Sequence, residues 1–293
     1  MTALVGLIDC DVTGFPNLAL MKLSTYHKKR GDIVTWYMEE LSGIYDKIYA
    51  SKVFTWTDPV IPDGAAIGGT GFLSSATLPD EIEHECPDYS LYPCDKSYGF
   101  LTRGCIRSCP ECFVPEKEGK IRAHADIDEF CRHNHTVLMD NNVLAHPHGI
   151  KQIEKMIKMK ISVDFNQGLD ARLIDNSMAK LLAKLKWKPS IRLACDSMAM
   201  IEPVRKAVEL LRWHNATPSQ YFCYVLVKGV EDALERVRFL KGIYVYPFCQ
   251  PYRDKKNTAP TPEQRHFARW VNARQAFRSC TWEDYRYNEG GDK

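Results

Sequence analysis

The stretch Tyr98-Gly-Phe-Leu-Thr-Arg-Gly-Cys105-Ile-Arg-Ser-Cys109-Pro-Glu-Cys112-Phe113 contains three cysteines within the eight residues 105–112. They follow a short apolar segment. Residues 98–102 predict a strand, so the cysteines should lie on the loop that follows it. A structural zinc site usually needs four protein ligands, whereas three cysteines on a cubane cluster leave one iron open. The spacing therefore favours a [4Fe–4S] cluster held by Cys105, Cys109 and Cys112.

A structural zinc site is the alternative for the same three cysteines. Its fourth ligand could be Cys94, Cys131 or His124. The chain would then be a non-catalytic zinc or iron–sulfur binding protein. The position of the cysteines favours the catalytic cluster, because a structural zinc site has no need of the strands and helices that follow.

Strands and amphipathic helices alternate along the rest of the chain. Six segments predict strands: 98–102, 136–140, 161–166, 190–195, 221–227 and 243–248. Apolar residues at helical spacing lie between them, as in Met178, Leu181, Leu182 and Leu185. This alternation indicates parallel strands with helical crossovers. We expect an α/β fold in which residues 98–293 form a partial (β/α)6 TIM-like barrel with a C-terminal helix, and a site at the carboxyl ends of the strands.

A smaller α/β domain is predicted for residues 1–77. Its strands should cover residues 3–8, 33–37 and 52–55, and residues 65–71 should form a strand that runs into a glycine turn. One helix is predicted between Pro16 and Gly31. Residues 78–97 contain several prolines and show no sustained periodicity, so they predict a linker between the two domains.

The composition is that of an ordinary globular protein, with 45% hydrophobic and 26% charged residues in a chain of 293. No apolar run is long enough for a transmembrane helix, and the first residues do not have the pattern of a signal peptide. We therefore expect a cytoplasmic protein with no membrane partner. Eleven cysteines in that compartment indicate metal binding rather than disulfides. The net charge of +2 neither requires nor excludes nucleic acid.

The cysteine motif after the first of six βα units resembles the radical S-adenosylmethionine (radical SAM) superfamily. The preceding Leu101-Thr-Arg-Gly-Cys105 resembles its methylthiotransferase-like and cobalamin-associated branch. The resemblance covers residues 98 to about 250. It implies that the three cysteines ligate a 4Fe–4S cluster whose open iron binds S-adenosyl-L-methionine. An electron from a donor such as flavodoxin or ferredoxin then generates a 5'-deoxyadenosyl radical, which abstracts hydrogen from substrate.

The resemblance also implies which residues contact S-adenosylmethionine. They are Phe113, Asn141, Asn142, Gln167, Arg172, Asp196 and Ser197. Phe113 resembles the aromatic residue beside the adenine, and the two asparagines suit the methionyl ammonium. Asp196 could bond the ribose hydroxyls, while Arg172 or Ser197 could bind the methionyl carboxylate. A helix cap or a solvated loop is the structural alternative for each of them. No catalytic residue is identified.

The N-terminal region resembles a degenerate cobalamin-binding domain. Asp9-Cys-Asp11-Val-Thr-Gly14 is similar to that family's Asp-x-His-x-x-Gly motif, and residues 68–71 resemble its later glycine turn. Asp11 stands in place of the ligand histidine, and a carboxylate is a poor ligand for cobalt. Cobalamin is therefore not expected as a cofactor.

Three residues at the tip of the sixth predicted strand are substrate candidates: Gln250, Tyr252 and Arg253. Arg253 would suit an anionic or heterocyclic group. The branch resemblance implies a small nucleobase-like substrate, such as a deazapurine, in a lyase or modification reaction. An RNA-modifying enzyme is the alternative, because arginines follow residue 262. It is not favoured, since no aromatic and basic RNA-binding module accompanies them.

Overall fold

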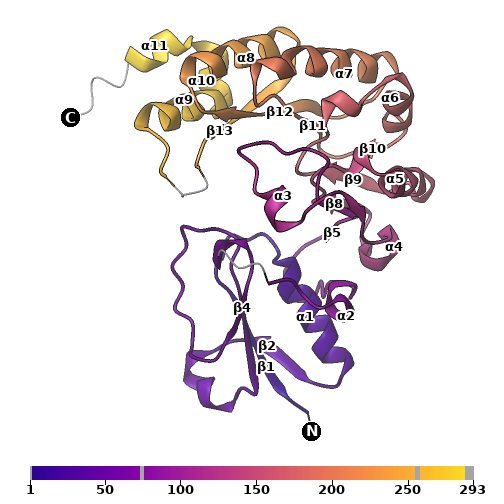
Figure 1. Cartoon of the computed structure of the whole chain (residues 1–293), viewed down its shortest axis with the longest axis vertical. Helices are drawn as coiled ribbons and strands as arrows, with labels where there is room; N and C mark the ends of the chain where they lie inside the picture. Colours follow the sequence, from indigo (N-terminus) through magenta and orange to yellow (C-terminus); the bar gives the residue numbers. More distant parts are fainter. Residues whose placement is uncertain (1, 73–75, 255–257, 288–293) are drawn as a thin grey trace. The chain divides into compact units, whose positions relative to one another are not determined.

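The structure is a computed structural model that describes residues 2–72, 76–254 and 258–287. It divides into two compact units (Figure 1). The first unit comprises Met1–Gly99 with Ala125–Asn134, and the second comprises Phe100–His124 with His135–Lys293. Residues 78–97, predicted as a linker, belong to the first unit and contain the short helix α2 (Asp80–Glu83).

The first unit is built on a parallel sheet with the strand order β2-β1-β3-β4. Its strands are β1 (Leu4–Asp9), β2 (Ile33–Trp36), β3 (Lys47–Ser51) and β4 (Ala66–Gly68). Helix α1 (Leu18–Lys29) begins at the cap Asn17 and buries Leu20 and Leu23 against Val5 and Leu7 of β1. The remaining elements are η1 (Glu39–Ile44), η2 (Thr70–Phe72), β5 (Ser97–Gly99) and α4 (Ile127–Phe130).

The strand predicted at residues 52–55 is wrong, because β3 ends at Ser51. The backbone N–H groups of Val53 and Phe54 donate to the carboxylate of Asp11, at 2.5 and 3.2 Å. They are therefore not available to a neighbouring strand.

The second unit contains two parallel groups of strands. One is β8 (His135–Leu138), β9 (Ser162–Phe165) and β10 (Lys186–Trp187), in the order β10-β9-β8, and the other is β11 (Ser190–Ala194), β12 (Gln220–Val227) and β13 (Tyr246–Pro251). An isolated parallel bridge joins Leu169 to Leu193. The parallel α/β prediction is confirmed, although these strands form separate sheets rather than one continuous wall.

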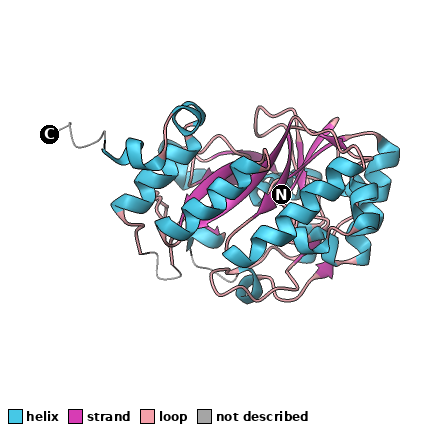
Figure 2. Ribbon diagram, turned by 90° about the horizontal axis from the view of Figure 1, so that it is seen from above, coloured by secondary structure: helices cyan, strands magenta, loops and turns pink. Residues whose placement is uncertain are grey.

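Helices lie alongside the strands (Figure 2). Those of the second unit are α3 (Val114–Lys117), α5 (Pro147–Met159), α6 (Asn176–Leu182), α7 (Ile201–Trp213), α8 (Val230–Gly242), α9 (Pro262–Asn272), α10 (Arg274–Ser279) and α11 (Trp282–Tyr287). Short 3-10 turns are η3 (Val143–Ala145), η4 (Ala171–Leu173) and η5 (Met198–Met200). One face of the sheet β11-β12-β13 packs into an apolar core, since Leu193, Cys223 and Val225 are fully buried.

Two of the six strands predicted from residue 98 onward need correction. Residues 98–102 do not form one strand, because β5 ends at Gly99 and β6 (Thr102–Arg103) pairs antiparallel with β7 (Arg122–Ala123). The sixth strand begins at Tyr246 rather than residue 243, because α8 runs to Gly242 and Tyr244 then takes a left-handed φ of 56° to leave the helix. The other four match within two residues.

Within the described ranges, none of the helices has the length and apolar character needed to cross a membrane.

Candidate functional site

The two ends of the cysteine loop are held together by hydrogen bonds between residues 104–105 and residues 118–119. The N–H of Cys105 donates to the carbonyl of Gly119 at 3.2 Å, and the N–H of Gly104 donates to the carboxylate of Glu118 at 2.9 Å. Gly104 has a φ of +79°, and a Cβ there would lie 2.4 Å from the carbonyl oxygen of Lys120. Only glycine fits this crossing of the two chain segments. Residues 104–119 therefore form a loop with a fixed base.

Asp140, two residues after the end of β8, anchors the chain that enters this loop. Its carboxylate is buried and accepts the N–H groups of Leu101 and Thr102 and the hydroxyl of Thr102, at 2.5 to 3.2 Å. Burial raises the pKa of Asp140 to about 6, although the hydrogen bonds from Thr102 and Leu101 act to lower it. These bonds explain why Leu101 and Thr102 do not extend β5.

The titration of Asp140 should make folding stability depend on pH. Because its folded pKa lies above the usual 3.8, the folded state binds this proton more tightly between pH 4 and 6. Stability should therefore fall as the pH rises through this window, by about 3 kcal/mol at most, and stay level above it. Asp140→Asn removes the titration but keeps an acceptor for Thr102. Urea unfolding at several pH values should show the wild type losing stability relative to Asp140→Asn from pH 4 to pH 7; a constant difference would contradict this.

The three thiols differ in exposure and in their contacts. Cys109 is exposed, whereas Cys105 and Cys112 are half-buried. The sulfur of Cys105 accepts the N–H of Arg107 at 3.3 Å, and the sulfur of Cys112 accepts the N–H of Val114 at 3.4 Å. A backbone hydrogen bond of 3.0 Å from Cys112 N–H to the Cys109 carbonyl curls the loop between them. Such N–H donors to sulfur stabilise thiolates and tune iron–sulfur clusters.

Asp170, after β9, joins the cysteine loop to the ends of two strands. Its carboxylate accepts Nε of Arg107 from the loop at 2.9 Å, Nε and Nη2 of Arg172 at 2.7 and 3.1 Å, and Nδ2 of Asn142 at 3.4 Å. Burial acts to raise the pKa of Asp170, but the two arginines outweigh it and lower the pKa. Asp170 in turn raises the pKa of Arg172, and the charges of Cys109 and Cys105 add to this effect.

Asn142, after β8, contacts one of the three cysteines directly. Its Nδ2 lies 3.5 Å from the sulfur of Cys105, and its side chain is almost completely buried. Its Oδ1 is buried and has no hydrogen-bond partner in the part of the chain that the structure describes. A buried acceptor without a donor is costly, so this oxygen is suited to receive an N–H from a ligand.

The three thiols are the donors that an iron–sulfur cluster would use. The described residues contain no group of three His, Cys, Asp or Glu side chains close enough together to hold one metal ion. A cubane cluster does not need such a group, because its thiolates bind different irons. For the zinc alternative, Cys94 and Cys131 belong to the first unit, while His124 belongs to the second unit and its backbone N–H donates to Leu101.

The other predicted contacts to S-adenosylmethionine lie in varied surroundings. Phe113 is 51% exposed beside the third cysteine, and Asn141 donates through Nδ2 to Glu118 at 3.0 Å. Gln167 is exposed and makes no side-chain hydrogen bond to the described residues. Asp196 accepts the N–H of Leu226 at 2.9 Å, and the exposed Ser197 caps the turn η5 with its backbone carbonyl.

Tyr252, one of the three predicted substrate residues, is linked to the cysteine loop through Lys228. The ammonium of Lys228, directly after β12, lies 5.4 Å from the ring centroid of Tyr252 and forms an ion pair with Glu111, which lies between Cys109 and Cys112. Gln250 and Arg253 are exposed. Sequence reasoning missed Glu111, Lys228, Glu118 and Arg107. The only signal for Glu111 and Arg107 was their place between the cysteines.

In the first unit, the predicted cobalamin-like motif is engaged in its own loop. The carboxylate of Asp11 accepts the hydroxyl of Thr57 at 2.8 Å in addition to the two backbone N–H groups. A Cβ on Gly69 would lie 2.2 Å from the carbonyl oxygen of Lys52. The glycine turn therefore lets the chain pass close to Lys52.

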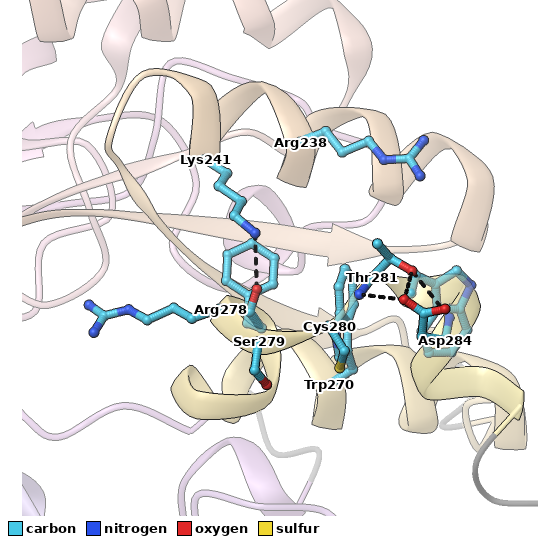
Figure 3. A pocket seen from close by; sticks show the side chains of 10 residues that line it. Arg238, Lys241, Trp270, Arg278, Ser279, Cys280, Thr281 and Asp284 are labelled. Atoms are coloured by element: carbon cyan, nitrogen blue, oxygen red, sulfur yellow. Dashed lines mark hydrogen bonds between the residues drawn. The ribbon is translucent and has the colours of Figure 1, made fainter.

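A cavity of about 270 Å³ lies among α8, α9, α10 and α11 (Figure 3). None of the predicted site residues lines it. Its cations do not converge on one point, since Arg238 and Arg278 point away from each other. Arg238 pairs with Glu283 at 2.9 Å, and Lys241 donates to the carbonyl of Phe277 at 3.1 Å. This cavity is not the candidate site.

No protein-family model matches the chain, and no curated relative does either. Among solved structures the chain is similar to SuiB of Streptococcus suis, at 12% sequence identity and a TM-score of 0.44. The match covers 64% of this chain and 48% of SuiB, so it spans about half of that protein.

Proposed function

We propose that this chain is a radical S-adenosylmethionine enzyme with a [4Fe–4S] cluster on Cys105, Cys109 and Cys112. One observation carries the proposal: Asn142 and Asp170, which follow two neighbouring parallel strands, contact the cysteine loop. Residues at the carboxyl ends of parallel strands form the binding sites of α/β proteins. We further propose that the two parallel sheets of the second unit form a partial barrel around this site.

In this proposal each contact has a role. Asp140 and Glu118 fix the base of the loop, so that the thiols are presented in one arrangement. Asp170 orients Arg172 toward a carboxylate, and the buried Oδ1 of Asn142 receives an ammonium N–H. When bound, the cluster supplies the open iron and the electron for cleavage of S-adenosylmethionine. The electron would come from a donor such as flavodoxin or ferredoxin.

The substrate in this proposal is small and nucleobase-like, with a deazapurine as the class that the resemblance implies. The reaction would be a lyase or modification reaction. The half-buried Tyr252, linked through Lys228 to Glu111, lies at the end of β13, where a substrate could approach the loop. Gln250 and Arg253 flank it in the sequence.

Anaerobic reconstitution tests the proposal. The protein should become brown, with about four irons per chain, and should release 5'-deoxyadenosine when S-adenosylmethionine and dithionite are added. Colourless protein with stoichiometric zinc would instead support the zinc-binding alternative.

A further inference from the structure

The second face of the sheet β11-β12-β13 carries polar and aromatic side chains. Strand register places Arg192, Phe222 and Tyr246 side by side on the three strands. Tyr224 and Phe248 form the next pair, two residues further along β12 and β13. Alternate residues of a strand share a face, so all five lie opposite the buried Leu193 and Val225. Four of them are half-buried, and Phe222 is 9% exposed. This face therefore keeps part of its surface accessible.

Arg192 is held rigidly on this face. Its Nε and Nη2 donate to the two carboxylate oxygens of Asp164 on β9, at 2.7 and 2.8 Å. Its Nη1 donates to the hydroxyl of Tyr224 at 3.2 Å, and that hydroxyl donates to the carbonyl of Asn166 at 2.7 Å. A guanidinium has five N–H donors, so one N–H on each terminal nitrogen has no partner among the described residues.

Aromatic rings surround this arginine. The rings of Phe222 and Phe248 are stacked, with centroids 5.6 Å apart and an angle of 28° between their planes. The guanidinium carbon lies 5.2 Å from the centroid of Phe222. Flat apolar rings beside fixed N–H donors are the features that recognise a planar heterocycle.

We infer that this face recognises a neutral planar heterocycle that carries two adjacent hydrogen-bond acceptors on one edge. The ring would stack on Phe222 and Phe248, and its two acceptors would take the spare N–H groups of Arg192. Asp164 neutralises the arginine, which favours uncharged acceptors over an anion. Gln250 lies on the same face, two residues after Phe248.

This inference rests on the proposed function, because the heterocycle is the substrate of the same site. It narrows the nucleobase-like class to purines with two adjacent acceptors, in place of the deazapurine that the family resemblance implies. A purine such as guanine offers O6 and N7 side by side, and arginine commonly bonds both. A 7-deazapurine lacks the N7 acceptor, so the face should prefer the purine.

Calorimetric titration of the iron-loaded protein with guanosine and with 7-deazaguanosine, in the presence of S-adenosylmethionine, tests the inference. The wild-type protein should bind guanosine about tenfold more tightly, the value of one hydrogen bond to a charged group. Arg192→Lys keeps the ion pair with Asp164 but loses the planar fork, so the preference should disappear. Phe248→Leu should weaken binding of both nucleosides about tenfold. Arg205→Lys, on the exposed surface of α7, is the matched control and should match the wild type.

Equal wild-type affinities, no binding of either nucleoside, or a preference that survives in Arg192→Lys would each overturn the inference. If Arg192→Lys does not fold, the wild-type comparison alone decides. Formation of 5'-deoxyadenosine, measured on the same preparation, tests the proposed function separately.

Discussion

The Cys109→Ala variant should fold normally and fail to hold its cluster. Cys109 is the exposed thiol of the three, so its removal leaves no buried cavity, and stability should change by less than about 0.5 kcal/mol. Loss of one of three ligands should lower the iron content from about four per chain to below one. Release of 5'-deoxyadenosine should fall at least 100-fold, since even changes around the ligands cost about 10- to 100-fold. Iron analysis, circular dichroism and product chromatography measure the three quantities.

Cys131→Ala is the matched control for this experiment. Cys131 is half-buried and lies in the first unit, where its thiol donates to the carbonyl of His133. The Cys131→Ala variant should keep its iron and its activity if the cluster has three protein ligands. Loss of metal in both variants would show that Cys131 is a fourth ligand, and the enzymatic proposal would then fail.

Sequence periodicity predicted the parallel strands of the second unit well, because their apolar runs are long and bounded by turns. It failed where side chains take over backbone hydrogen bonds. Asp140 captures the N–H groups of Leu101 and Thr102, and Asp11 captures those of Val53 and Phe54. Each capture ends a predicted strand. A carboxylate that lies 39 or 42 positions away in the sequence leaves no local pattern to reveal it.

The candidate site shows the same division. The cysteines are predicted from their spacing, and Asn142 from its place after a strand. The partners that fix them could not, because Glu118, Asp170 and Lys228 act through contacts with residues distant in the sequence. Asp170 in particular reads as a loop residue, and only the folded chain brings Arg107 and Asn142 to its carboxylate.

Replacing Arg236 should cost more stability than any other single substitution considered for this chain. Arg236 lies on α8 and is fully buried. Its Nη1 donates to the carbonyl of Cys195 at 2.7 Å, and its Nη2 donates to the carbonyl of Leu226 at 3.1 Å and pairs with Asp232. These carbonyls lie at the carboxyl ends of β11 and β12, beyond the last residue pair that joins the two strands. The arginine therefore ties two strand ends to the helix that covers them.

Arg236→Ala should lower the free energy of unfolding by about 3 to 5 kcal/mol, because it leaves two buried carbonyls without a donor and opens a cavity. Arg236→Lys should lose less, since its ammonium can still reach one carbonyl. Arg238→Ala is the control two positions along α8, where the exposed ion pair with Glu283 is worth at most about 1 kcal/mol. Urea unfolding of the three variants measures these differences. A cost for Arg236→Ala no larger than that for Arg238→Ala would mean that water or a rearranged helix satisfies the strand ends. Asp196, which follows Cys195 and accepts the N–H of Leu226, would then be positioned without Arg236.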